Sequence, residues 1–184
     1  VFGVGLVFSM AMVYYTLLAV PAWSHWATLA TFFTTTILLG ALAIGAAFVG
    51  GYSYQTARKH EGNEKQRRIL EVTLRWMALL ALIMLGVQFI VQPIYMGYLA
   101  VAGPVAAQSA AILVDEHGML FALLWLPLFL GAGVFGAFIY KVASDAKSFR
   151  TVSALAFSAF ALVLASELIG RYLFYASFAR IGPL

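Results

Sequence analysis

Long apolar runs separated by short polar connections make up most of the chain. A helix that crosses a hydrocarbon core of about 30 Å needs roughly 20 apolar residues. Five runs reach this length, at residues 1–20, 26–50, 72–91, 119–140 and 151–170. The pattern therefore predicts an all-α, polytopic integral membrane bundle. We expect five transmembrane helices in a single transmembrane domain over residues 1–184.

A sixth apolar stretch, residues 95–114, is ambiguous. Gly103-Pro104 interrupts it and leaves only residues 105–114 after the break, which is too short a segment to span. We interpret the stretch as an outer-face loop that contains a short interfacial helix with Pro104 in its first turn.

The basic residues alternate with the apolar runs in a way that predicts the topology. Nine of the eleven Lys and Arg residues lie in two short stretches, residues 58–75 and 141–150. Basic loops stay on the cytoplasmic side of a membrane, and five spans place both stretches on that side, whereas a sixth span at 95–114 would separate them. The first helix then runs from inside to outside, and the C-terminus lies outside.

Composition excludes several classes of function. The chain is 64% hydrophobic and 10% charged, which is far from the composition of a soluble domain. Its net charge of +4 arises from cytoplasmic turns rather than from a basic patch with interleaved aromatics, so it does not indicate nucleic-acid binding. The absence of cysteine excludes disulfides, iron–sulfur ligation and thiol catalysis by this chain.

Glu167 is the acidic residue that most invites a functional reading. It lies about one turn before the expected end of the last helix, and Arg171 follows it at i+4 on the same helical face. One interpretation is an intrahelical ion pair that holds the helix end at the interface. The other is a proton acceptor or a member of a ligand pocket, because a carboxylate in a membrane helix is costly to keep there.

Further titratable groups are expected at the outer face. Asp115, Glu116 and His117 precede the fourth helix, where acidic residues are favoured by the helix dipole and capping is a sufficient explanation. His25 lies between two tryptophans and fits a solvated interfacial position. Together, however, His25, Glu116, His117, Glu167 and Arg171 could supply the proton acceptors and polar partners of a quinol-binding site. We predict no catalytic residue and no metal site in this chain.

Two other classes remain open. A cytochrome b-type subunit generally needs two histidines that face each other inside the membrane, and no histidine lies in the middle of a predicted span. A secondary transporter tends to have polar or broken helices at the midplane. Here only Gln88 and Thr34-Thr35-Thr36 offer such polarity.

The last predicted helix carries a motif. Residues 166–175 read S-E-L-I-G-R-Y-L-F-Y. This run resembles the closing pattern G-E-L-I-G-R-x-x-F-Y of the membrane anchor subunits of dimethyl sulfoxide reductase-type molybdoenzymes, with Ser166 in place of Gly. Residues 13–15, 20–23 and 32–33 (V-Y-Y, V-P-A-W and F-F) look like the fourth helix of that family, its outer turn and the start of the fifth.

The resemblance implies a function and a set of partners. Family members have eight helices with both ends outside, so the five expected here are the last five of eight, and the chain is the C-terminal part of a longer protein. Such anchors lie in the bacterial inner membrane, with the C-terminus on the periplasmic side. They carry no haem, oxidise menaquinol in anaerobic respiration and hold an iron–sulfur subunit and a molybdopterin catalytic subunit.

The resemblance also limits the site. The family's most important His and Glu lie in the preceding helices, and only Glu167 and Arg171 carry over by motif. The chain is thus expected to be a subunit of an oxidoreductase complex that is not catalytic alone. Its basic stretch at residues 52–75 is either a docking surface for a partner or a simple cytoplasmic turn.

Overall fold

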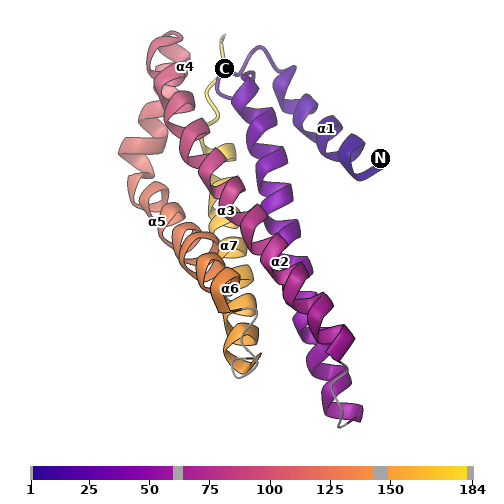
Figure 1. The fold of residues 1–184 in the computed structure, drawn as a ribbon. Helices are drawn as coiled ribbons and strands as arrows, with labels where there is room; N and C mark the ends of the chain where they lie inside the picture. Colours follow the sequence, from indigo (N-terminus) through magenta and orange to yellow (C-terminus); the bar gives the residue numbers. More distant parts are fainter. Residues whose placement is uncertain (1, 60–63, 143–148, 182–184) are drawn as a thin grey trace. The chain divides into compact units, whose positions relative to one another are not determined.

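The computed structural model describes residues 2–59, 64–142 and 149–181, and within these ranges the chain is helical with no strand (Figure 1). His60, Glu61, Asp145 and Lys147 of the two basic stretches lie outside the described residues. The α-helices are α1 (Phe2–Tyr15), α2 (Trp26–Lys59), α3 (Glu64–Val101), α4 (Pro104–Ala111), α5 (Gly118–Leu128), α6 (Gly136–Val142) and α7 (Phe149–Ala176). Two π-helical segments, η1 (Ile112–Glu116) and η2 (Phe129–Phe135), join α4 to α5 and α5 to α6.

Within the described ranges, four helical stretches are long and apolar enough to cross a membrane. They are Trp26–Thr56, Glu64–Val101, Gly118–Lys141 and Arg150–Ala176, with lengths of 31, 38, 24 and 27 residues. They correspond to four of the predicted spans, and the all-α membrane bundle is confirmed. The predicted count of five is not confirmed, because α1 has only 14 residues and rises about 21 Å.

The end of α1 explains why the first predicted span is shortened. The Thr16 hydroxyl donates to the carbonyl of Met12 at 2.9 Å, and Leu17 and Val20 form turn hydrogen bonds with carbonyls three residues earlier. Residues 16–20 therefore form turns even though they are apolar enough to extend the run. Hydropathy alone therefore cannot predict that the helix ends at Tyr15.

The prediction of a loop that begins at Tyr95 is wrong. Helix α3 continues through Pro93 to Val101. Two contacts support this extension: the Tyr95 hydroxyl donates to the Ala22 carbonyl at 2.9 Å, and Leu99 is fully buried. The predicted short helix with Pro104 in its first turn is confirmed as α4, which follows Gly103 at φ 131°, a conformation that favours glycine. Its position at a membrane surface stays a prediction.

The last helix is also longer than predicted. It runs to Ala176 rather than to Gly170, so Glu167 lies more than two turns before the helix end instead of one. Its position one turn from the end was therefore predicted wrongly. The carboxyl group is held correspondingly further inside the helical segment.

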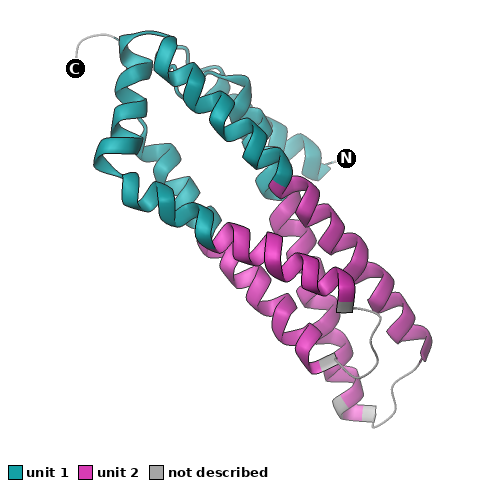
Figure 2. Cartoon of the chain, turned by 60° about the vertical axis from the view of Figure 1, so that its left-hand side comes forward, with its two compact units in different colours: residues 1–36, 86–126, 166–184 teal, residues 37–85, 127–165 magenta. Residues whose placement is uncertain are grey.

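The chain divides into two compact units, which Figure 2 shows in separate colours. Unit 1 comprises residues 1–36, 86–126 and 166–184, and unit 2 comprises residues 37–85 and 127–165. All five predicted site residues belong to unit 1, and both basic stretches belong to unit 2. The single transmembrane domain stays a prediction.

Unit 1 has an apolar core formed by segments that are far apart in the sequence. Val20, Ala22, Leu99, Ala106, Leu113 and Leu173 are buried together there. The Ile181 backbone N–H also donates to the Ala19 carbonyl at 2.8 Å, which fixes the segment after α7 to the turn after α1. The core thereby positions the start of α2 and the end of α7 beside each other.

Unit 2 packs through small residues. A Cβ atom placed on Gly131 of η2 would lie 2.9 Å from the Ala159 carbonyl oxygen and 2.9 Å from Val163 Cγ2. Ala132, the next residue after Gly131, and Ala159 of α7 are both fully buried. Small side chains let helix backbones approach closely, which is the usual means of helix association in an apolar solvent.

Candidate functional site

Glu167 is held in a small polar group inside unit 1. Its side chain is 9% exposed, and both of its oxygens accept hydrogen bonds from other helices. Thr35 of α2 donates from Oγ1 to Oε2 at 3.0 Å, and Gln88 of α3 donates from Nε2 to Oε1 at 3.0 Å. We call Glu167, Thr35 and Gln88 the Glu167 cluster. A buried carboxyl group with two directed donors from two further helices is a fixed element of the unit.

The neighbours of Glu167 in the motif bring α7 close to α5. The Ser166 hydroxyl donates to the Leu124 carbonyl at 2.7 Å, and Ser166 is almost fully buried. A Cβ atom on Gly170 would lie 3.0 Å from Leu124 Cδ1, so a larger residue at position 170 would require the Leu124 side chain to shift. Ser166 and Gly170 thus set the depth and orientation of Glu167.

Arg171 does not form the expected ion pair with Glu167. An ion pair at i+4 spacing does form elsewhere, between Arg67 and Glu71 of α3 at 3.1 Å. The Arg171 guanidinium instead lies over the Phe32 ring, 3.9 Å from its centroid, where the cation is attracted to the face of the ring. Arg171 thus lies one helical turn after Glu167 on α7 and contacts an aromatic ring instead of the carboxyl group.

Further aromatic rings pack beside Phe32, the ring that Arg171 contacts. The Trp23 and Phe174 rings stack with centroids 5.5 Å apart, and Trp23 Nε1 donates to the Phe174 carbonyl at 2.9 Å. The Tyr14 and Tyr175 hydroxyls lie 3.0 Å apart. Tyr14, Trp23, Phe32, Phe174 and Tyr175 are called the aromatic group below. The separate stretches of sequence that carry the family resemblance therefore meet in space.

His25 lies in a different setting, just before α2. Its ring stacks on Tyr98 with centroids 4.0 Å apart and planes at 17°. The Ala27 backbone N–H donates to Nδ1 at 3.2 Å, so the proton of the neutral ring resides on Nε2. Burial lowers the pKa of His25 from its usual 6.5, which favours the neutral ring at pH 7.

His117 and Glu116 occupy a third setting, between η1 and α5. The His117 ring stacks on Tyr172 with centroids 5.6 Å apart, and Nε2 lies 3.5 Å from the Tyr172 hydroxyl. The His117 carbonyl accepts from the Phe121 N–H and so starts α5. Glu116 is exposed. The five predicted residues share unit 1, but no hydrogen bond between described residues joins His25 or His117 to Glu167.

Sequence reasoning missed the partners of Glu167. Thr35 and Gln88 were noted only as the sparse polarity of the spans, and a link between them and Glu167 was not predicted. The available signal was their rarity, since a polar side chain in an apolar helix needs a partner. Thr35, Gln88 and Glu167 lie in three different spans, so their pairing could have been proposed from the sequence.

The chain was also compared with known protein families. A model of the DMSO reductase anchor subunit (DmsC) family matches residues 1–177. The chain belongs to this family. No curated protein and no solved structure matches it. As a DmsC-type anchor with four helices long enough to span, the chain is a multi-pass membrane protein that associates with other subunits of a DMSO reductase complex.

Proposed function

We propose that this anchor binds and oxidises menaquinol during anaerobic respiration. It passes the electrons to a partner iron–sulfur subunit, which transfers them to a molybdopterin catalytic subunit. Family membership supports the partners, and the Glu167 cluster beside the Arg171–aromatic group is the observation that supports the quinol site.

The chemistry of the site fits a quinol headgroup. Oxidation of a quinol releases two protons and two electrons, so its ring hydroxyls need polar acceptors and its ring needs a flat apolar contact. Glu167 offers two carboxyl oxygens, and Gln88 is only half-buried and can turn from Glu167 towards a ligand. The rings of the aromatic group offer stacking surfaces. His25 and His117 are further proposed acceptors at the same unit, with Glu116 at its surface.

The proposed topology follows from the basic stretches. Residues 58–75 and 141–150 face the cytoplasm of a bacterial inner membrane, and the C-terminus faces the periplasm. The anchor carries no haem in this proposal, so the quinol must approach a cluster of the partner subunit closely.

Glu167→Gln tests the quinol site in the full complex. The substitution preserves shape but leaves one of the two donors facing an amide N–H₂, and we expect quinol-analogue binding to weaken by roughly 5- to 150-fold, the equivalent of about 1–3 kcal/mol for a buried polar group that loses its partner. Glu64→Gln, an exposed glutamate in the first turn of α3, is the matched control and should leave binding unchanged.

Four measurements separate the alternatives. The amount of assembled complex is measured alongside analogue affinity, so that loss of assembly is not mistaken for loss of binding. Unchanged affinity in a fully assembled Glu167→Gln complex would remove Glu167 from the quinol site. An absorption spectrum with a Soret band that disappears in His25 or His117 variants would replace the proposal with a cytochrome b-type subunit. Substrate flux by the purified chain without partners would replace it with a transporter.

A further inference from the structure

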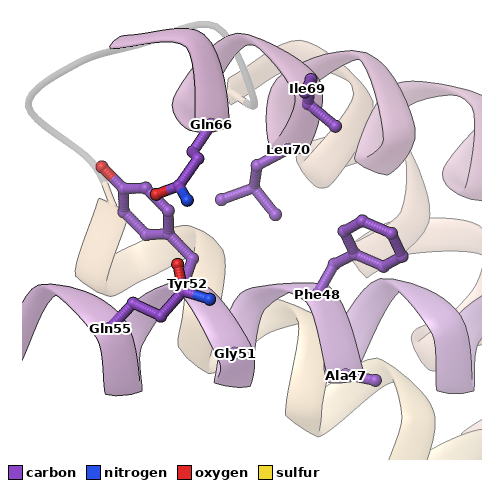
Figure 3. Close-up of a pocket in the computed structure, with 8 residues that line it drawn as sticks. All are labelled: Ala47, Phe48, Gly51, Tyr52, Gln55, Gln66, Ile69 and Leu70. Atoms are coloured by element: carbon purple, nitrogen blue, oxygen red, sulfur yellow. The ribbon is translucent and has the colours of Figure 1, made fainter. Parts of the chain in front are cut away.

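Unit 2 contains a pocket that plays no part in the proposed quinol chemistry. It lies between α2 and α3 and has a volume of about 400 Å³, within the range of roughly 300–1,000 Å³ that is typical of ligand pockets. Figure 3 shows its lining, which comprises Ala47, Phe48, Gly51, Tyr52, Gln55, Gln66, Ile69 and Leu70. All eight residues belong to unit 2.

The lining changes from apolar to polar along the two helices. Ala47, Phe48, Ile69 and Leu70 form the apolar end, and Figure 3 shows the Tyr52 ring and the Gln66 side chain facing each other at the opposite end. Gln55 lies one turn beyond Gly51 on α2 and adds a second amide there. A ligand that fits this lining must itself have an apolar body and a polar end.

Basic side chains follow directly after the polar end. Arg58 is at i+3 from Gln55 on α2, and Lys65 is four residues before Ile69 on α3, so each continues the face that lines the pocket. Both side chains are exposed. On α3, Arg67 is paired with Glu71, and on α2 the Arg58 guanidinium lies over the Tyr54 ring, 4.9 Å from its centroid.

We propose that this pocket holds an acyl chain of an anionic phospholipid, whose phosphate lies between Arg58 and Lys65. Long basic side chains at the ends of membrane helices keep their charge at the level of the lipid headgroups, and basic pockets between such helices bind anionic headgroups. The occupant is a lipid rather than a free anion because the pocket extends into an apolar end that a free anion would not fill.

Charge complementarity also favours a phospholipid over a quinone. A quinone headgroup is uncharged and offers the two cations only hydrogen-bond acceptors, whereas a phosphate diester also gains a charge–charge attraction from each. The inference is independent of the proposed quinol site, which lies in unit 1. It makes bound lipid a structural component of the region that carries the basic stretches.

Gly51→Leu blocks the pocket without disturbing the packing. A Cβ atom on Gly51 meets nothing within 4 Å, so the leucine side chain has room to enter the cavity, and leucine is a better helix former than glycine. Gly40→Leu is the matched control. It lies in the same helix and has the same free space around its Cβ, but it does not line the pocket.

The experiment uses the full complex in nanodiscs that contain equal amounts of phosphatidylglycerol and phosphatidylcholine. Native mass spectrometry counts the lipids that stay bound, and phosphatidylglycerol with a photoreactive acyl chain labels the protein for peptide mapping. We expect retained phosphatidylglycerol and labels on residues 47–55 and 66–70. Gly51→Leu should lower this labelling at least tenfold, and Gly40→Leu should not change it.

A second variant tests the headgroup and does not depend on the first. Arg58→Gln with Lys65→Gln should reduce the preference for phosphatidylglycerol over phosphatidylcholine by about fivefold for each charge removed. Because both side chains are exposed, the variant should assemble even if Gly51→Leu does not. Equal retention of the two lipids by the wild type would overturn the proposal, as would unchanged labelling in an assembled Gly51→Leu complex or displacement of the label by a menaquinone analogue.

Discussion

Replacing Thr35 with valine removes one of the two hydrogen bonds that hold Glu167, with almost no change in shape. The bond is 3.0 Å long, and its two residues are only 5% and 9% exposed, so no water can take the place of the hydroxyl without rearrangement. A buried acceptor that loses its donor costs about 1–3 kcal/mol. We therefore expect Thr35→Val to lower the free energy of unfolding by that amount.

The measurement is reversible unfolding of the protein in mixed micelles of a mild detergent and dodecyl sulfate. Thr36→Val is the control, because Thr36 is exposed and its hydroxyl donates at 2.8 Å to the Phe32 carbonyl of its own helix. That carbonyl remains part of the α-helix after the substitution. Thr36→Val should thus change the free energy of unfolding by no more than about 0.5 kcal/mol.

A double-mutant cycle with Glu167→Gln isolates the pair. If the hydroxyl acts through the carboxyl group, the two substitutions together should cost less than the sum of their separate effects, with an interaction of about 0.5–3 kcal/mol. Equal losses in Thr35→Val and Thr36→Val, or strict additivity with Glu167→Gln, would refute the reasoning that the Glu167 cluster is a coupled unit.

Two further predictions concern packing and pH. Gly131→Ala should lower the free energy of unfolding by about 1–3 kcal/mol, because its Cβ would lie 2.9 Å from the Ala159 carbonyl oxygen. Gly86→Ala, whose Cβ would have nothing within 4 Å, should raise the free energy of unfolding by up to about 1 kcal/mol in the same assay. His25 has a lowered pKa in the fold, so the unfolded chain binds its proton more readily, and stability that is present above pH 6.5 should fall as the pH drops through 6.5 towards the folded pKa. His25→Phe, which keeps a ring against Tyr98, should flatten that dependence in a pH series of unfolding curves; an equally steep curve in the variant would assign it to other groups.

Much of the fold could be predicted because hydropathy and helix geometry act locally. Four spans follow from the length of the apolar runs, and the start of α4 follows from the Gly103-Pro104 pair. The errors fall at helix ends. The end of α1 at Tyr15 is set by local turn hydrogen bonds that hydropathy does not show. The extension of α3 to Val101 is supported by burial and by contacts with another segment, such as the bond from Tyr95 to Ala22.

The site was predictable only in part. Glu167 stands out in the sequence because an acidic residue in an apolar helix is rare. Its expected partner, Arg171, was chosen from i+4 spacing, and the structure instead pairs the carboxyl group with Thr35 and Gln88. Spacing within one helix cannot show which side chain on another helix will be nearer, and the Phe32 ring offers Arg171 a contact that no local rule anticipates.

The sequence by itself determined that this is a membrane helix bundle, which residues could span, and which family the closing motif resembles. Each of these depends on composition or on order along the chain. Only the tertiary structure decided that Glu167 is bound by two other helices, that the scattered aromatic stretches meet beside the ring that Arg171 contacts, and that a pocket opens between α2 and α3. The reason is physical: helices in an apolar solvent form from local hydrogen bonds, but polar side chains find their partners only when the helices pack.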